Sequence, residues 1–218
     1  ESFRTLLTDK KFGTIVPYYI SQIYFHQKEY KQLISFAKPL SENVISSRKA
    51  EINRFLAEAY YRTSDFTNSV NHFEVYLSEG KENNPLVYFL LGHAHYKSGN
   101  YLSAIANLEK VSNSADSVLQ YSTYYLGASY LKLENHNYAL QAFKKSSTYD
   151  YNSKLKEDAY FNYAKLSYQL ELPFDNTLEI LKTYLETYNN LLHKKEIETL
   201  MVQTLQGTSK YFEAFDAL

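Results

Sequence analysis

Histidines and closely spaced carboxylates are the side chains of this 218-residue chain that could bind a metal or transfer a proton. His93 and His95 are two residues apart, which on a helix separates them by about 200° around the axis. They therefore cannot bind one metal ion together. The carboxylate pair Glu157/Asp158 lies among other charged residues, without the apolar setting that raises a carboxyl pKa for acid–base catalysis.

The known motifs of catalytic and cofactor sites are absent from the sequence. It contains no phosphate-binding loop, no dinucleotide-binding glycine motif, no nucleophile elbow and no zinc-protease motif. It also contains no cysteine, which excludes thiolate metal sites and thiol nucleophiles. We therefore predict a protein that is not an enzyme, with no catalytic residue, no metal site and no cofactor.

The charge balance excludes two further classes of protein. The 23 Lys and Arg residues nearly equal the 24 Asp and Glu residues, and neither sign is concentrated in a block. Such a chain is neither a typical nucleic-acid binder nor a polybasic membrane anchor, and no apolar run approaches the roughly 18 residues of a membrane span. Residue 1 is Glu, so the compartment is left open: cytoplasmic, or periplasmic or outer-membrane-associated if the parent chain has a signal peptide.

A seven-residue block with one pattern of large and small side chains occurs three times, at intervals of 35 residues. The blocks are 55–61 (FLAEAYY), 90–96 (LLGHAHY) and 125–131 (YLGASYL). Each is followed by a polar break and a second apolar stretch, at about 66–77, 101–111 and 138–146. Apolar residues recur three and four positions apart in both halves, as in amphipathic helices. The sequence therefore predicts an all-α chain of helix–turn–helix units.

Small residues at equivalent positions predict close packing of the two helices in each unit. Gly92 and Gly127 lie inside predicted first helices, where glycine costs about 1 kcal/mol relative to alanine, and Ala57 takes the same place one unit earlier. The equivalent small residues of the second helices are Ser69, Ala104 and Ala139. We expect small residues to face each other across the hairpin, with a larger side chain four residues later filling the space beside them.

At these positions the chain resembles the tetratricopeptide repeat family, whose pattern is W-x2-L-G-x2-Y followed by A-x3-F over about 34 residues. The L-G-x2-Y part reads Leu56-Ala57-x2-Tyr60, Leu91-Gly92-x2-His95 and Leu126-Gly127-x2-Tyr130. The family's tryptophan is replaced by Asn53, Tyr88 and Thr123. The resemblance implies a right-handed α–α superhelix, or solenoid, of helical hairpins. His95, at a tyrosine position, is expected in the core, and His93 is expected to face a groove or solvent.

The repeat spacing divides the chain into a single array of five full units and two partial ones. The full units are 14–49, 50–84, 85–119, 120–156 and 157–194, and the partial units are 1–13 and 195–218. Residues 1–12 resemble a second helix, 197–206 and 211–218 resemble a shortened hairpin, and the turn at Pro173 has one extra residue. Because neither end shows a polar capping unit, we expect an excerpt of a longer array.

The resemblance also implies that first helices line a concave groove, and it gives the residues that point into it. They are Tyr18, Phe25, Arg54, Tyr61, Arg62, Phe89, His93, Tyr96, Lys97, Tyr124, Lys132, Phe161, Lys165 and Tyr168. Aromatic rings with basic groups beside them suit a protein or peptide segment, because rings supply contact area and Arg or Lys can pair with carboxylates. The expected function is a protein-interaction scaffold. Any one of these rings could instead pack against the adjacent repeat.

Two other interpretations remain open at this point. Exposed aromatic rings can stack on sugar rings, so the chain could bind a glycan or another small ligand. Alternatively, the array could have a structural role and self-associate through its uncapped ends. Neither alternative requires nucleic acid or insertion into a membrane.

Overall fold

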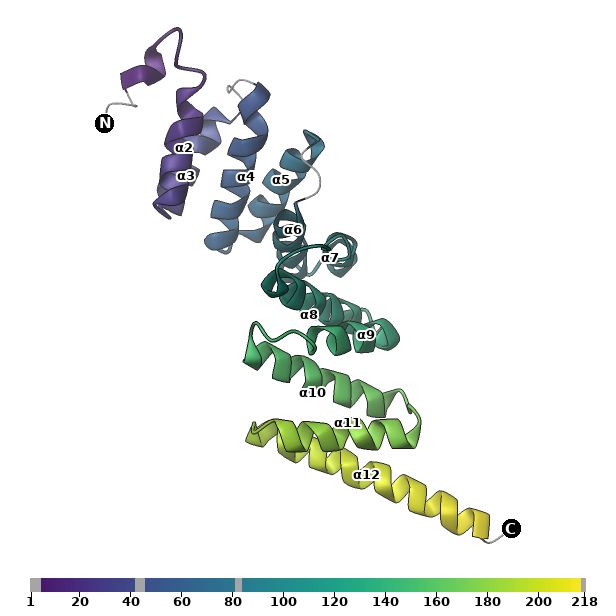
Figure 1. Cartoon of the computed structure of the whole chain (residues 1–218). Helices are drawn as coiled ribbons and strands as arrows, with labels where there is room; N and C mark the ends of the chain where they lie inside the picture. The colour runs from purple at the N-terminus through teal and green to yellow at the C-terminus, as the bar shows by residue number, and fades with distance from the viewer. Residues whose placement is uncertain (1–4, 42–45, 81–83, 217–218) are drawn as a thin grey trace. The chain divides into compact units, whose positions relative to one another are not determined.

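A computed structural model of the protein describes residues 5–41, 46–80 and 84–216, and these contain eleven α-helices, two short 3-10 helices and no strand (Figure 1). The chain forms two compact units, Glu1–Lys110 and Val111–Leu218. The first contains η1 (Leu6–Thr8), α2 (Val16–His26), α3 (Tyr30–Ala37), η2 (Lys38–Leu40), α4 (Ser46–Arg62), α5 (Phe66–Ser78), α6 (Pro85–Lys97) and α7 (Tyr101–Leu108). The second contains α8 (Asp116–Lys132), α9 (His136–Ser146), α10 (Ser153–Gln169), α11 (Phe174–Thr187) and α12 (Leu191–Asp216).

Helices that follow one another in the sequence pack as antiparallel hairpins within each unit. In unit 2, for example, α10, α11 and α12 lie side by side (Figure 1). Leu56 on α4 and Phe73 on α5 are fully buried in unit 1, and Phe143 on α9 and Leu181 on α11 are buried in unit 2. The prediction of amphipathic helical hairpins is confirmed.

The five turns that join α2–α3, α4–α5, α6–α7, α8–α9 and α10–α11 share one backbone conformation. The second residue beyond the first helix has a positive φ in every case: Lys28 59°, Ser64 63°, Gly99 80°, Glu134 57° and Glu171 50°. The next N–H then donates to the carbonyl five residues earlier, as in Asp65 N to Tyr60 O at 2.9 Å, which is the Schellman ending of a helix. Ser64, Gly99 and Glu134 are 35 residues apart, so the period seen in the sequence is the period of the turns.

The small residues of the first helices admit side chains from the second helices. A Cβ added to Gly92 would lie 2.7 Å from Leu108 Cγ and 3.2 Å from the Ala104 carbonyl oxygen. A Cβ on Gly127 would lie 3.0 Å from Cγ of Phe143. Gly92 thus faces the small Ala104 as expected, and at both glycines the larger side chain four residues later, Leu108 or Phe143, fills the space beside the glycine.

A buried amide fixes the loop between the second and third helices of unit 2. Gln120 on α8 is fully buried, and its Nε2 donates to the carbonyls of Tyr149 at 2.9 Å and Asn152 at 3.1 Å. Its Oε1 accepts from the Asn152 N–H at 2.8 Å. Because buried backbone groups require partners, this one side chain holds the start of α10 against α8.

Two expectations about the chain ends are wrong. Within residues 5–12 the structure has only the short helix η1 and turns, and not the second helix of a hairpin; residues 1–4 lie outside the described part. At the other end, α12 is one continuous helix where a shortened hairpin was expected. Gly207 is the only glycine of the sequence between residues 191 and 216, and a helix accepts an isolated glycine at a cost of about 1 kcal/mol. The extra residue expected in the turn at Pro173 is present, since four residues separate α10 from α11.

Candidate partner-binding surface

Four aromatic rings gather around His93 in unit 1, and together with it they form what we call the His93 cluster: Tyr61, Phe66, Phe89, His93 and Tyr96. The cluster draws its members from α4, α5 and α6. The Tyr61 hydroxyl and His93 Nδ1 share a hydrogen bond of 2.7 Å. Phe89 and Tyr96, one turn before and about one turn after His93, stack on it with ring centroids at 6.0 Å and 6.4 Å. These contacts fix the rings relative to one another.

His93 is the most buried ring of the cluster and does not face solvent. It is 8% exposed, whereas Tyr61, Phe89 and Tyr96 keep intermediate exposure. Burial, and secondarily the charge of Lys97, lowers the pKa of His93 to about 4, so the imidazole is neutral at pH 7. Of the two alternatives expected for His93, a solvent-facing ring is wrong and a groove-facing ring stays a prediction; the imidazole is the buried base of a partly exposed aromatic surface.

Two exposed cations flank the His93 cluster. Arg62 is the last residue of α4, and its guanidinium carbon lies 5.9 Å from the centre of the Tyr61 ring. Lys97 is the last residue of α6 and is likewise exposed. A cation at the end of a helix interacts favourably with the helix dipole. The same two side chains also leave positive charge beside exposed aromatic area, where an acidic group of a partner could pair with them.

Arg54 is already paired within its own helix. Its Nη1 lies 2.5 Å from Glu58 Oε1 and its Nε lies 3.2 Å from Glu51 Oε2. Its guanidinium carbon also lies 4.8 Å from the Phe55 ring centre and 5.8 Å from that of Phe25. Burial raises the pKa of the Glu58 carboxyl, and the Arg54 charge opposes that shift. Arg54 therefore serves the packing of unit 1, and a role as a partner-binding cation stays a prediction for it.

The rings predicted for the first groove unit also pack inside unit 1. Phe25 stacks at a tilt on buried Phe55, with centroids 5.0 Å apart. Tyr18 lies 6.0 Å from the same Phe55 ring and carries the Arg48 guanidinium 4.5 Å from its own centre. Both residues contribute mainly to the contact between α2 and α4.

In unit 2, the predicted residue Phe161 is 7% exposed and is covered by His193 from α12. The two rings stack face to face, with centroids 3.9 Å apart and an angle of 4° between their planes. Lys165 Nζ forms an ion pair of 2.6 Å with Glu196 Oε1, also on α12. The end of α12 that packs on α10 thus occupies the surface at which a groove was expected.

The other predicted residues of unit 2 do not form a cluster like that around His93. The Tyr124 hydroxyl donates a short hydrogen bond to the Asp158 carboxylate, and its ring packs 5.5 Å from that of Phe143. Tyr168 is half-buried, and Lys132 is exposed at the end of α8. The best-formed group of predicted site residues is therefore in unit 1.

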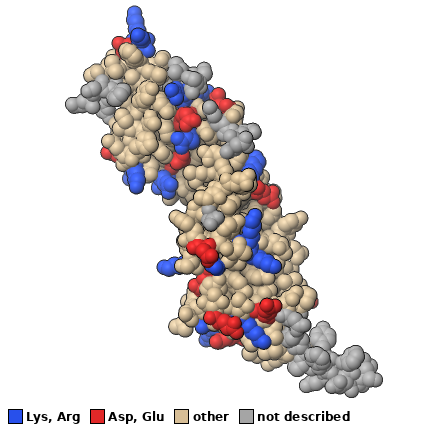
Figure 2. Space-filling view, viewed as in Figure 1, with Lys and Arg blue, Asp and Glu red and all other residues tan. Residues whose placement is uncertain are grey.

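The residues that the structure describes contain no cluster of side chains suited to bind a metal ion. No group of three or more His, Cys, Asp or Glu side chains among residues 5–41, 46–80 and 84–216 is placed to hold an ion. No helix in the same ranges is long and apolar enough to cross a membrane. Figure 2 shows Lys and Arg interspersed with Asp and Glu on the visible face, separated by wide uncharged areas.

No protein-family model and no curated protein sequence matches the chain. Solved structures match it in fold. YrrB, described as a TPR protein with an unusual peptide-binding site, superposes over 91% of this chain and 98% of its own, with a TM-score of 0.71 and 16% identity. The chain has the fold of a tetratricopeptide repeat array.

Further tetratricopeptide structures agree with this assignment. A MamA structure covers 81% of this chain and 92% of its own, with a TM-score of 0.63 and 17% identity. The C-terminal part of a TPR repeat-containing protein from Cytophaga hutchinsonii covers 89% of this chain and 81% of its own, with a TM-score of 0.60 and 14% identity. The predicted all-α tetratricopeptide fold is confirmed.

Several residues that shape the surface of this tetratricopeptide array were not predicted from the sequence. Phe66 belongs to a second helix, yet it joins the His93 cluster with its ring perpendicular to the imidazole. His193 and Glu196 belong to α12, which matched the family pattern poorly, and they cover Phe161 and Lys165. Phe66 could have been found from its place at the start of the second helix, next to the turn, whereas nothing in the sequence indicated the partners on α12.

Proposed function

We propose that the chain is a non-catalytic protein-interaction scaffold, and that the His93 cluster of unit 1 binds a segment of a partner protein. The observation that carries the proposal is the fixed group of partly exposed rings on α4 and α6, tied together by the hydrogen bond between Tyr61 and His93. Aromatic anchors that are already ordered lose little entropy on binding and dominate many interfaces. YrrB, which is similar in fold, is described as having a peptide-binding site.

The charges beside the cluster indicate what the partner segment carries. Arg62 and Lys97 are exposed at its edge, whereas Glu58, the nearest acidic group on α4, is 8% exposed and paired with Arg54. Asp65, next to Phe66, is only partly exposed and accepts from Asn68 as the cap of α5, so the charged residues of α4 and α6 that are exposed beside the cluster are the cations Arg62 and Lys97. We expect a segment that places an aromatic or aliphatic side chain on the rings and an acidic residue beside Arg62 or Lys97.

Selection of a ligand from a library of short displayed peptides, followed by affinity measurements on variants, tests the proposal. Tyr96→Ala should weaken the selected peptide at least about tenfold, because loss of a central aromatic anchor is costly. Tyr138→Ala is the matched control, since it removes a tyrosine that is 60% exposed from a second helix in unit 2. Equal affinity of the two variants would contradict the assignment.

A second pair of variants covers the case in which a ring is needed for folding. Arg62→Ala with Lys97→Ala removes two exposed charges and should leave helicity unchanged while it weakens an acidic peptide. Tyr61→Phe keeps the ring and removes the hydroxyl that shares a hydrogen bond with His93. If the charge variant keeps full affinity and Tyr96→Ala unfolds the chain, the rings belong to the core and the proposal fails.

A further inference from the structure

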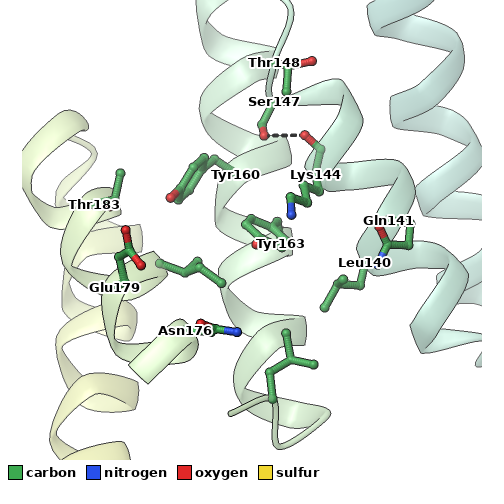
Figure 3. Close-up of a pocket in the computed structure, with 12 residues that line it drawn as sticks. Leu140, Gln141, Lys144, Ser147, Thr148, Tyr160, Tyr163, Asn176, Glu179 and Thr183 are labelled. Atoms are coloured by element: carbon green, nitrogen blue, oxygen red, sulfur yellow. Dashed lines mark hydrogen bonds between the residues drawn. The ribbon is translucent and has the colours of Figure 1, made fainter. Parts of the chain in front are cut away.

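A cleft of about 580 Å³ opens on unit 2 between two second helices. Its walls are α9 and α11, and its floor is the face of α10 that carries Tyr160 and Tyr163 (Figure 3). Leu140 on α9 and Ile180 on α11, both largely buried, add apolar side chains to the two walls next to the floor. The volume is in the range of small-ligand and peptide side-chain sites. The first helices, which carry the proposed partner-binding surface, contribute only this floor.

The two aromatic rings of the cleft floor pack against each other. The rings of Tyr160 and Tyr163 meet edge to face, with centroids 5.7 Å apart and planes at 88°. Tyr163 is 8% exposed, and the Lys144 ammonium lies 5.7 Å from the centre of its ring. This ring is therefore largely covered, whereas Tyr160 keeps intermediate exposure.

The two walls carry opposite charges that do not meet. Lys144 is exposed on α9 and Glu179 is exposed on α11 (Figure 3). Within the described part of the chain, neither side chain forms an ion pair. Glu179 lines the cleft together with Tyr163, and burial, followed by the charges of Tyr160 and Glu179, raises the pKa of Tyr163. A ligand that crosses the cleft therefore meets a cation on one side and an anion on the other.

Each wall also presents a carboxamide. Gln141 on α9 and Asn176 on α11 are exposed, and neither side chain makes a hydrogen bond to another described residue. A carboxamide both donates and accepts, so it can pair with the N–H and C=O of an extended backbone. Paired amides beside apolar side chains are what a peptide strand needs to insert one side chain and hold its main chain.

We propose that this cleft is a second binding site, which takes a peptide segment with an apolar side chain flanked by an acidic residue toward Lys144 and a basic residue toward Glu179. The apolar side chain would contact Leu140 and Ile180, and the amides of Gln141 and Asn176 would bind the main chain. This site is independent of the His93 cluster, so either one can fail without the other.

Three pools of synthetic peptides with a central Leu or Tyr test the proposal on the whole 218-residue chain. One pool has an Asp and an Arg on opposite sides of the central residue, one has two Asp, and one has two Arg. The unchanged protein should bind the mixed pool about fivefold more tightly than either of the others, because each exposed charge pair contributes modestly. Lys144→Glu should move the preference to the two-Arg pool, and Glu179→Lys should move it to the two-Asp pool.

Matched control variants distinguish an effect of charge inside the cleft from a general effect of the protein's net charge. Lys145→Glu and Glu186→Lys make the same charge changes on α9 and α11 at exposed positions outside the cleft lining, and they should leave the mixed-pool preference unchanged. Asn176→Trp places a bulky ring at the exposed mouth and should abolish binding of the mixed pool. Tyr96→Ala, in the other unit, should not affect it.

Several results would overturn the proposal. Equal binding of the three pools, a shift in the controls as large as in the cleft variants, or unchanged affinity in Asn176→Trp would each exclude a peptide in this cleft. Binding on a glycan array that Asn176→Trp removes would assign the cleft to a sugar instead. Concentration-dependent association that the same variant removes would assign it to a second copy of the chain.

Discussion

For the glycines inside first helices, packing decides whether replacement by alanine raises or lowers the stability of the protein. Alanine at Gly92 or Gly127 gains about 1 kcal/mol of helix propensity. At Gly92 the new Cβ would lie 2.7 Å from Leu108 Cγ and 3.2 Å from a backbone oxygen, whereas ordinary contacts begin at 3.4 Å. Overpacking of this kind costs about 1–3 kcal/mol. Gly92→Ala should therefore lower the stability by about 1 kcal/mol.

Two further glycines calibrate the size of the effect. At Gly127 the nearest atoms to an added Cβ are ring carbons of Phe143 at 3.0–3.1 Å, a milder overlap than at Gly92. In Gly127→Ala the gain in helix propensity and the cost of overpacking should therefore nearly cancel. Gly207 lies within α12, and its Cβ would meet nothing within 4 Å. Gly207→Ala should then raise the stability by about 1 kcal/mol.

Urea and thermal unfolding followed by circular dichroism measure this series. For a chain of this length, 1 kcal/mol corresponds to a change in Tm of about 3 °C. In a Leu108→Ala background the overlap with Gly92→Ala disappears, so the second substitution should become stabilising. If Gly92→Ala raises the midpoint in the unchanged background as much as Gly207→Ala does, close packing is not the reason for the glycine.

Four other changes have definite expected outcomes. Gln120→Ala leaves buried backbone groups of the α9–α10 loop without partners and should cost roughly 3 kcal/mol in urea unfolding, whereas an exposed-site control should cost almost nothing. Glu134→Gly relieves a positive φ of 57° and should raise Tm by an amount equivalent to about 1 kcal/mol; a lower Tm would refute the turn argument. His93 has a folded pKa of about 4 against 6.5 unfolded, so up to about 3 kcal/mol of stability, fully present above pH 6.5, should be lost as pH falls toward 4, and His93→Gln should flatten that slope. Arg54→Ala leaves the buried Glu58 carboxylate without its ion-pair partner and should destabilise unit 1 by about 2 kcal/mol. An unchanged free energy of unfolding would instead favour a role for Arg54 in partner binding.

The periodic part of the sequence was enough to predict the helical hairpins. Leu56, Leu91 and Leu126 and the small residue after each recur at one spacing, and packing between repeats depends on that pattern. The turns were located by polar breaks, although four of the five positive-φ positions are not glycine and gave no signal of their conformation. Local sequence does not reveal which non-glycine residue adopts that conformation, because the surrounding helices impose it.

The candidate surface was predicted less completely, for a physical reason. Family equivalence gives the direction of a side chain on its own helix, but it does not give the neighbours that cover it. Arg54 is paired by Glu51 and Glu58 on the same helix, which a spacing of three and four residues allows but does not require. Phe161 is covered by His193, thirty-two positions away, through packing that no repeat pattern specified.

The central claim is that a partner segment lies on the rings of unit 1. The most direct measurement is a nuclear magnetic resonance titration of the side chains of Tyr61, His93 and Tyr96 with the peptide selected by the chain. Saturable shifts of these rings, absent in the Arg62→Ala/Lys97→Ala variant at the same peptide concentration, are the predicted result. Ring signals that stay unchanged while the peptide binds would place the partner elsewhere and contradict the account.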